Sequence, residues 1–480
     1  MQARARMAWV DRSAARWVVL GVCIAAGLAV RAALYHVQTG DYTFFVSRWY
    51  DFLAQNGGFS ALKYDLSNYN PPYLYLLTLA TYLPVSELHA IKSISVVFDI
   101  VLAAFTFLIL RMTYQRTTVP VIGALAAFLA PTVIINGASL GQCDAIYTAF
   151  CLGSLYFILA DRPAWACIFF GLALSFKLQA VFFAPVILLL LLRGKRSALC
   201  LLLVPVTCGV LLLPAIAAGR DVQSLLRIYV DQVETGGMSP VQMPSTMQGP
   251  SHAGGIPYGM GESPTRPRNG FGSGRENGPG AGRGVGPRSD AGPGSGLPPV
   301  MVRAGGNAGG GSFQFAPSAF SFNAPSFYQW LPANAPAYWK WIGTLLAGLL
   351  VAVLGIIAFI NRKKLTREVI VTFALLSVIA LPFLLPKMHE RYFYAADVTS
   401  IVFAFYFPRY AGVAVIMQLA SLLSYEPYFF NHDAPPAYLP YVSLGVLALI
   451  VVVAAKLVIL LYPRRLAMTL PHVRIGSRPA

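Results

Sequence analysis

Residues 17–51 read WVVLGVCIAAGLAVRAALYHVQTGDYTFFVSRWYD: an apolar run, a short polar link and an aromatic segment headed by Asp41. The run 17–35 is long enough to cross a bilayer, since a membrane helix needs about 20 apolar residues. In the segment that follows, Asp41, Phe45 and Arg48 share one face at helical spacing. A carboxylate next to a membrane span is costly unless the protein uses it. This stretch therefore predicts a membrane helix and then an interfacial helix that carries a functional acid.

The whole chain has the composition of a polytopic membrane protein. Of its 480 residues, 56% are hydrophobic and only 11% are charged, whereas soluble domains carry about 25% charged residues. The net charge of +17 does not predict a nucleic-acid partner, because much of it lies in short loops and tails, where it orients the protein in the membrane. None of the six cysteines stands in a CxxC or CxxH pattern, so we expect no metal site, no disulfide framework and no cofactor.

About twelve apolar spans are expected along the chain, within a range of eleven to thirteen, which makes the fold class all-α. The spans cover residues 17–35, 90–110, 119–135, 145–160, 198–218, 342–360, 369–385, 393–407, 411–423 and 441–461, with two short spans that break around residues 175–179. The short loops alternate in charge as the positive-inside rule requires. The N-terminus carries Arg4, Arg6, Arg12 and Arg16 and is therefore expected in the cytoplasm.

The spans fall into two modules with a long external loop between them. Residues 1–219 form the N-terminal module, whose external loop 36–89 is expected to hold interfacial helices. Residues 339–480 form the C-terminal module and end in a basic cytoplasmic tail. The external loop 220–338 contains an insertion, 235–312, that is rich in Gly, Pro, Ser and Asn. The insertion has too few large apolar residues to offset the entropy of ordering, so we expect it to be disordered.

Polar side chains from distant segments are all predicted at the external face. Carboxylates and cations that gather at one depth favour a shared polar cavity over isolated snorkelling side chains. For Lys387 taken alone, snorkelling is the simpler interpretation. The candidates for substrate binding beside Asp41 are Asp51, Asn70, Gln142, Asp144, Lys177, Gln179, Lys387, His389, Glu390 and Arg391.

Such a site suits the transfer of a sugar from a lipid phosphate. A carboxylate near the acceptor hydroxyl serves as general base, and Asp41 is the candidate for this catalytic role. Cations from Arg, Lys or His stabilise the leaving phosphate, and the lipid tail accounts for a site at membrane depth. From spacing alone, the simpler role of Asp41 is the N-cap of an interfacial helix, since Asp is a favoured cap. The two roles can coexist.

Several short motifs, taken in order, resemble a known group of membrane enzymes. They are an Asp shortly after the first span, Tyr69-Asn70-Pro71-Pro72, Gly141-Gln142-x-Asp144, Phe176-Lys177-Leu178-Gln179-Ala180 and Leu385-Pro386-Lys387-Met388-His389-Glu390-Arg391-Tyr392. Together they resemble bacterial integral-membrane proteins related to the second mannosyltransferase of GPI-anchor synthesis. These belong to the GT-C superfamily of polyprenyl-phosphate-sugar-dependent glycosyltransferases. The His-Glu pair is also similar to that of the dolichyl-phosphate-glucose glucosyltransferases.

The resemblance implies a GT-C-like fold and an inverting transfer from a donor such as polyprenyl-phosphate mannose to a glycan, lipid or protein acceptor. It implies that Asp41 matches the catalytic aspartate of the first external loop, and that His389, Glu390 and Arg391 lie near the donor phosphate. It further implies a bacterial inner membrane location with the site facing the periplasm or the outside. No Asp-x-Asp motif stands in the first external loop, which weakens a metal-dependent interpretation.

Two functions from other classes compete with a transferase. A secondary transporter or lipid flippase also uses paired charges and broken helices inside the membrane. The hydropathy pattern shows no inverted repeat, however, and the charges are predicted at one face rather than at the midplane. The third possibility is a noncatalytic envelope scaffold that uses the Gly/Pro-rich loop. The depth of Asp41 relative to His389-Glu390-Arg391 discriminates between the transferase and the transporter.

Overall fold

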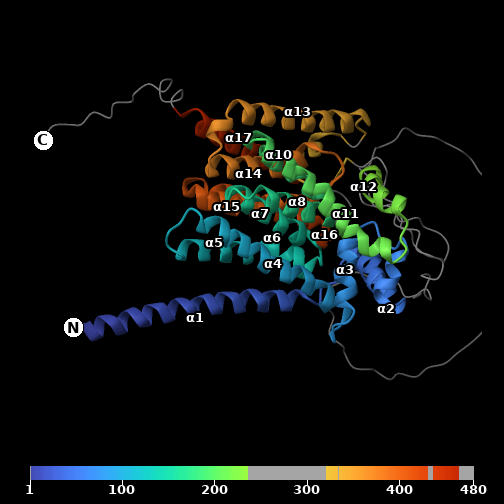
Figure 1. Cartoon of the computed structure of the whole chain (residues 1–480), viewed down its shortest axis with the longest axis horizontal. Helices are drawn as coiled ribbons and strands as arrows, with labels where there is room; N and C mark the ends of the chain where they lie inside the picture. The colour runs from blue at the N-terminus through green and yellow to red at the C-terminus, as the bar shows by residue number, and fades with distance from the viewer. Residues whose placement is uncertain (1, 236–319, 333, 431–435, 464–480) are drawn as a thin grey trace, which may run out of the picture.

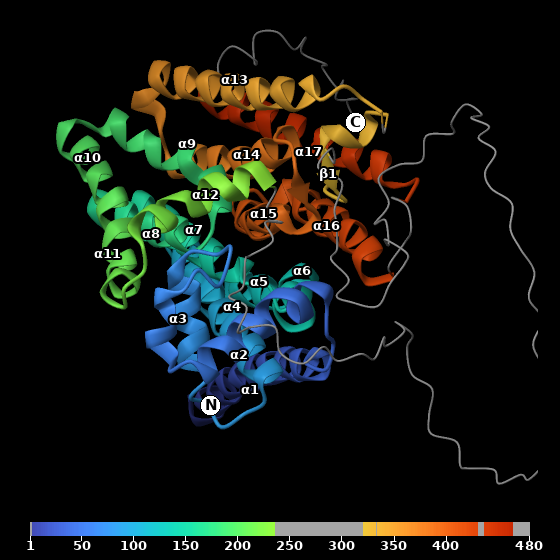
Figure 2. The ribbon, with the colours of Figure 1, turned by 90° about the vertical axis from the view of Figure 1, so that its right-hand side faces the viewer.

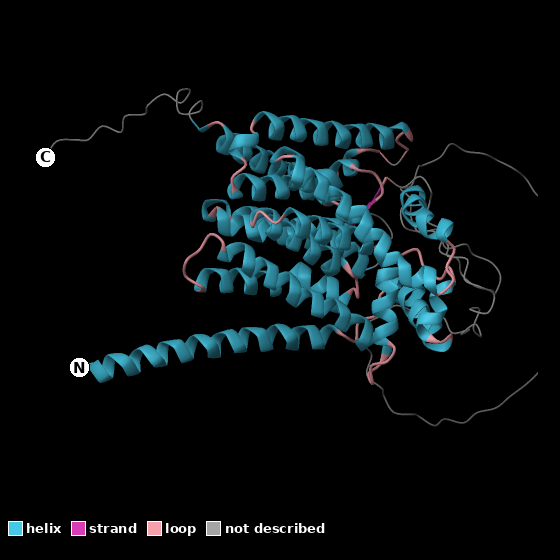
Figure 3. Ribbon diagram, in the orientation of Figure 1, coloured by secondary structure: helices cyan, strands magenta, loops and turns pink. Residues whose placement is uncertain are grey.

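The structure is a computed structural model that describes residues 2–235, 320–332, 334–430 and 436–463 (Figure 1). Apart from Thr235, the predicted disordered insertion lies outside the described residues, as does the tail from residue 464 onward. The described part is helical almost throughout (Figure 3). Its two short strands, β1 (Ser321–Phe322) and β2 (Met388–His389), pair in parallel. The all-α class predicted from the sequence is confirmed.

The α-helices follow one another with short connections. In chain order they are α1 Gln2–Leu34, α2 Ser47–Gln55, α3 Pro71–Ala80, α4 Glu87–Arg111, α5 Thr118–Phe128, α6 Pro131–Ile134, α7 Asp144–Leu159, α8 Pro163–Phe176, α9 Ala184–Ile187, α10 Lys195–Leu199, α11 Leu203–Ala217, α12 Val222–Thr235, α13 Tyr338–Ile360, α14 Arg367–Leu384, α15 Tyr394–Tyr406, α16 Gly412–Phe430 and α17 Leu439–Leu461.

Each predicted span corresponds to a helix or to a broken helix. Within the described residues, seven helices are long and apolar enough to cross a membrane, or eight when the bent pair Thr118–Phe128 and Pro131–Ser139 counts as one span. Three shorter apolar helical segments, Asp144–Leu159, Pro163–Phe176 and Leu178–Arg193, stand where the sequence predicts the span 145–160 and the two short spans around Lys177. The chain is a polytopic membrane protein by these criteria.

The long helices lie side by side in a layered bundle (Figures 1 and 2). In the end-on view, helices α13 to α17 form the upper part, α1 to α7 the lower part, and α8 to α11 lie along one side. Helix α14 is apolar on all faces and 83% of its span is buried, as expected for a central helix. Helix α1 diverges from the bundle toward its N-terminus, and only 11% of its span is buried.

Helices α2, α3 and α12 gather at one end of the bundle, which we call the site end; it lies to the right in Figure 1. The apolar run 74–83 is too short to span and predicts an interfacial helix; helix α3 forms there and begins earlier, at Pro71. Proline suits this first helical position, because its missing N–H would be unpaired there anyway. A buried aromatic cluster fills the space between α2 and α3, with the rings of Trp49 and Tyr69 5.2 Å apart and those of Tyr69 and Tyr73 5.4 Å apart.

The segment after Asp41 departs from ordinary helical spacing. Residues Tyr42–Val46 form a π-helical turn before α2 begins. The Arg48 guanidinium lies 6.0 Å from the ring of Phe44, four residues earlier.

Candidate functional site

The carboxylate of Asp41 lies where three distant segments meet at the site end. Its Oδ2 accepts a hydrogen bond of 2.6 Å from Nε2 of Gln142, just before α7. The same oxygen forms an ion pair with Nη2 of Arg391 at 3.1 Å. The backbone N–H of Asp41 donates to the hydroxyl of Tyr428 in α16. Helix packing therefore joins an acid, an amide and a cation that stand about 100 and 350 positions apart in sequence.

Asp41 does not act as a helix cap through its side chain. Its backbone already has helical angles, and its carboxylate makes no capping hydrogen bond. The hydroxyl of Thr39 instead accepts from the backbone N–H of Tyr42 at 3.4 Å, the geometry of an N-cap three residues upstream. The Asp41 carboxylate is thus directed away from its own helix and toward Gln142 and Arg391.

Arg391 lies between two carboxylates. Its Nη1 donates to Oε1 of Glu390 at 2.9 Å, and its Nη2 faces Asp41. Burial lowers the pKa of Arg391, but the carboxylates of Asp41 and Glu390 more than offset this and raise it, so the group stays charged. Burial also raises the pKa of Glu390, and the Arg391 guanidinium offsets part of that shift. Nδ1 of His389 lies 3.8 Å from Oε2 of Glu390.

A short irregular link between α14 and α15 presents these residues. Helix α14 ends at Leu384, and Lys387 takes a left-handed backbone conformation with φ +59°. Strand β2 then pairs with β1, where the ring of His389 stacks on that of Phe322 at 4.6 Å. A 3-10 turn over Glu390–Phe393 leads into α15. The strand pairing holds the link in place next to the turn that carries Glu390 and Arg391.

A second ion pair lies close to the first. Nζ of Lys177 is 2.5 Å from Oδ1 of Asp144, and Nδ2 of Asn136 donates to Oδ2 of Asp144 at 2.9 Å. Asp144 is the first residue of α7, and Lys177 stands at the break that follows α8. Asp144 is fully buried, and Lys177 is 5% exposed. Removal of either partner would leave an uncompensated charge in the interior of the bundle.

The aromatic ring of Tyr69 lies between the two ion pairs. Nζ of Lys177 is 5.6 Å from its ring centroid, and both Lys177 and Arg391 interact electrostatically with its hydroxyl group. Tyr392, beside Arg391, likewise interacts with both cations and with Asp144. Asp41, Gln142, Glu390, Arg391, Asp144 and Lys177 therefore make one polar site with two cations and three carboxylates, and Tyr69 and Tyr392 lie between its halves.

The remaining sequence candidates lie beside this site or outside it. Asn70 is buried at the start of α3, near Tyr229 of α12. Gln179 is 8% exposed, and its Oε1 finds no hydrogen-bond partner among the described residues. Asp51 lies on the exposed face of α2. Lys387 directs its Nζ to the carbonyl oxygen of Glu234 at the end of α12, where a cation suits the helix dipole.

Other residues that position the site were not singled out by the sequence patterns. Nζ of Lys92 donates to the carbonyl oxygens of Leu34, Tyr35 and Val37 at 3.2, 3.1 and 2.5 Å, which holds the chain just before Asp41. Ser95, one turn further along α4, donates to the carbonyl oxygen of Gln142 at 2.6 Å. Lys92 could have been singled out from the sequence, because a lysine within an apolar span is costly unless it has a partner.

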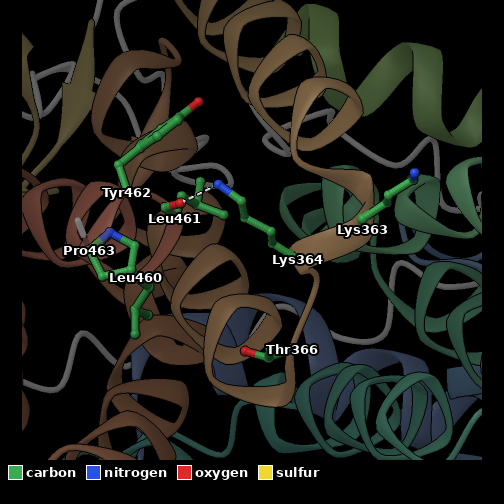
Figure 4. Close-up of a pocket in the computed structure, with 7 residues that line it drawn as sticks. All are labelled: Lys363, Lys364, Thr366, Leu460, Leu461, Tyr462 and Pro463. Atoms are coloured by element: carbon green, nitrogen blue, oxygen red, sulfur yellow. Dashed lines mark hydrogen bonds between the residues drawn. The ribbon is translucent and has the colours of Figure 1, made fainter. Parts of the chain in front are cut away.

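A cavity at the opposite end of the bundle belongs to a different region. It is lined by Lys363, Lys364, Thr366, Leu460, Leu461, Tyr462 and Pro463 (Figure 4). Nζ of Lys364 donates to the carbonyl oxygen of Leu461 at 2.6 Å. This cation therefore pairs with the C-terminal end of α17, where a positive charge suits the helix dipole. The site around Asp41 and this cavity therefore lie at opposite ends of the spans.

The geometry of the site can support proton removal next to an anion-binding group. Asp41 is 28% exposed at its side chain, so a hydroxyl group from outside can reach it, whereas Arg391 is 10% exposed. A carboxylate that can take a proton and a buried guanidinium that can hold a phosphate stand 3.1 Å apart. Transfer of a group from a phosphate to a hydroxyl needs both.

Comparisons with known proteins agree with this chemistry. Residues 68–257 match the model of glycosyltransferase family 87. GPI mannosyltransferase 1 of Kluyveromyces lactis is 25% identical over 146 residues, which is 30% of this chain and 35% of that protein. The chain thus matches about a third of the length of this curated relative. The two comparisons confirm the resemblance to the GT-C glycosyltransferases and support a glycosyltransferase activity.

The family match covers only part of the site. Asn70, Gln142, Asp144, Lys177 and Gln179 lie within residues 68–257. Asp41, Asp51 and the run from Lys387 to Arg391 lie outside this range. The contacts of Asp41 with Gln142 and Arg391 therefore join the matched segment to residues on both sides of it.

Proposed function

We propose that this protein is an integral-membrane glycosyltransferase that moves a sugar, with mannose the first candidate, from a polyprenyl-phosphate donor to an acceptor at the external face of a bacterial inner membrane. The observation that carries the proposal is the Asp41 carboxylate held between Gln142 and Arg391 at the site end of the bundle. The acceptor is a glycan, a lipid or a protein with a free hydroxyl group.

The reaction follows from the roles of these groups. Asp41 accepts the proton of the acceptor hydroxyl as its oxygen forms a bond to the anomeric carbon of the sugar. The bond between that carbon and the phosphate oxygen breaks, and the electron pair stays on that oxygen of the phosphate, which leaves still attached to its lipid tail. Arg391 and Lys177 stabilise the negative charge on the phosphate. Attack on the face opposite the leaving group inverts the anomeric configuration.

The placement of charge supports an external site. The site end holds Asp41, Gln142 and Arg391, which follow α1, precede α7 and precede α15. The other end of the same spans holds the basic connections of the bundle, which the positive-inside rule assigns to the cytoplasm. These basic residues are Arg111, Arg116, Arg193, Lys195, Arg196, Arg362, Lys363, Lys364 and Arg409.

This placement also favours a transferase over a transporter. A transport pathway needs its site near the midplane, with access from both sides. Here the charged residues of the site stand at the ends of α1, α8 and α14 and at the starts of α7 and α15, rather than halfway along them. A transferase that takes its donor from the outer leaflet needs its charges at this depth.

A transfer assay with the purified protein and a panel of polyprenyl-phosphate sugars tests the proposal. Asp41→Asn keeps the size of the side chain but removes the proton acceptor, so transfer should fall by about 10²- to 10⁴-fold. Asp221→Asn is the matched control, because Asp221 is an exposed carboxylate that caps α12 and Asn caps equally well. Full transfer by Asp41→Asn on a donor that the wild-type protein uses would refute the role of Asp41 as base.

A further inference from the structure

The contacts of Arg391 leave one of its donors unused. Nη1 donates to Glu390, and Nη2 pairs with Asp41. Nε is buried and has no hydrogen-bond partner among the described residues, although only 8% of the residue is exposed. An unpaired buried donor costs free energy, and its presence in a polar site indicates a ligand that supplies the missing acceptor.

The Nε and Nη2 atoms of an arginine form an edge with two parallel donors. In Arg31 both donors of this edge are paired, because Nε and Nη2 lie 3.0 and 2.9 Å from Oδ2 of Asp99. In Arg391 the same edge holds Asp41 through Nη2 alone. A phosphate can offer one oxygen to each donor of the edge, including the Nε that Asp41 leaves without a partner among the described residues.

The same ion pair with Arg391 also limits how Asp41 can act as a base. Its Oδ2 receives both the hydrogen bond from Gln142 and the ion pair from Arg391. A proton from an acceptor hydroxyl must compete with a permanently charged guanidinium for this oxygen. Without donor, Oδ2 of Asp41 stays engaged by the guanidinium.

We propose that the donor phosphate takes over the Nε–Nη2 edge of Arg391 and thereby releases Asp41 for the acceptor hydroxyl. The inference rests on the proposed function and adds an order to it, in which the donor binds first and the base becomes available only on a loaded site. Donor phosphate and Asp41 then compete for one guanidinium.

Competition for Arg391 predicts that Asp41→Asn has opposite effects on donor affinity and on transfer. Asp41→Asn should lower transfer but removes the competitor for Arg391, so donor should bind more tightly. The pair is partly buried, with side chains 10% and 28% exposed, so its strength lies between that of a surface pair and that of a buried one. We expect the dissociation constant to fall by roughly 5- to 30-fold.

Donor affinity is measured by titration calorimetry with the full-length protein in nanodiscs. The probes are a short-chain polyprenyl-phosphate mannose and the same polyprenyl phosphate without sugar, which isolates the contribution of the phosphate. Four proteins form a cycle: wild type, Asp41→Asn, Arg391→Gln and the double variant. Arg391→Gln should weaken binding at least tenfold, and adding Asp41→Asn to it should change nothing further. Asp221→Asn should bind as wild type does.

The cycle separates competition from general charge repulsion. Equal or weaker donor binding by Asp41→Asn would overturn the inference, and so would the same tightening in the Arg391→Gln background. If Arg391→Gln does not fold, Arg391→Met replaces it in the cycle, since it fills the space without an unpaired donor. Donor binding without the predicted tightening overturns the inference and leaves the transferase standing, whereas no binding of any probe by wild type overturns both.

Discussion

The attachment of α1 to the bundle depends on one buried arginine. Because only 11% of the span Trp17–Leu34 is buried, the contacts of Arg31 carry much of the attachment near the end of α1. Nε and Nη2 contact Asp99 in α4, Nη1 donates to the carbonyl oxygen of Gly27 at 3.2 Å, and Nη2 donates to that of Phe128 at 2.7 Å. The guanidinium also lies 4.0 Å from the centroid of the Phe128 ring. Asp41 follows α1 closely, so this attachment also positions the proposed base.

Arg31→Met should therefore destabilise the protein strongly. The variant leaves Asp99, which is fully buried, without its cation, while Oδ1 of Asp99 already has no hydrogen-bond partner among the described residues. Breaking a buried pair in this way costs about 3–5 kcal/mol. Arg31→Met with Asp99→Val removes both charges and should recover most of the loss, because an apolar replacement of a buried pair is often neutral.

Unfolding in mixed micelles with increasing denaturing detergent measures these free energies. The control is Asp161→Asn, which weakens the pair of Arg193 with an 83% exposed carboxylate and should cost less than about 1 kcal/mol. Asn also tolerates the positive φ of 56° at that position. An Arg31→Met protein within 1 kcal/mol of wild type would refute the reasoning, and so would a double variant that is less stable than the single one.

Two further predictions concern the loops. Lys387 donates from Nζ to the carbonyl oxygen of Glu234 and from its backbone N–H to that of Phe320 at 2.8 Å. This one residue therefore contacts the chain on both sides of the segment 236–319. Replacing that segment with a Gly/Ser linker of about ten residues should preserve membrane insertion and transfer, and the shorter loop should favour folding by roughly 2 kcal/mol; lost insertion on a membrane-fractionation assay would contradict this. Single cysteines in the loops that carry Asp41, Gln142 and His389 should react with an impermeant external reagent, while cysteines beside Arg116, Lys195 and Lys363 stay protected; labelling of the Asp41 and His389 loops from opposite sides would disprove a shared site.

The sequence by itself determined the class of the fold and the course of the chain. Span length and hydropathy are local properties, since each apolar run must match the bilayer core and satisfy its own backbone hydrogen bonds within a helix. For this reason the predicted spans correspond to helices, including the breaks near Lys177. The same local rules located the polar residues at one face and drew attention to Asp41 and to the run from Lys387 to Arg391.

Only the tertiary structure decided which polar side chains meet. Asp41 and Arg391 are 350 positions apart, and their contact depends on how α1, α4 and α15 pack, which no local pattern specifies. Asp51 and Asp41 have the same chemistry, yet Asp51 lies on the exposed face of α2, whereas Asp41 contacts Gln142 and Arg391. Lys387 and Arg391 stand four residues apart, but the left-handed backbone at Lys387 and the pairing of β2 direct Lys387 to α12 and leave Arg391 in the site. Burial then determines what each charge can do, because a cation inside the bundle must find a carboxylate or a phosphate, whereas one at the surface is satisfied by water.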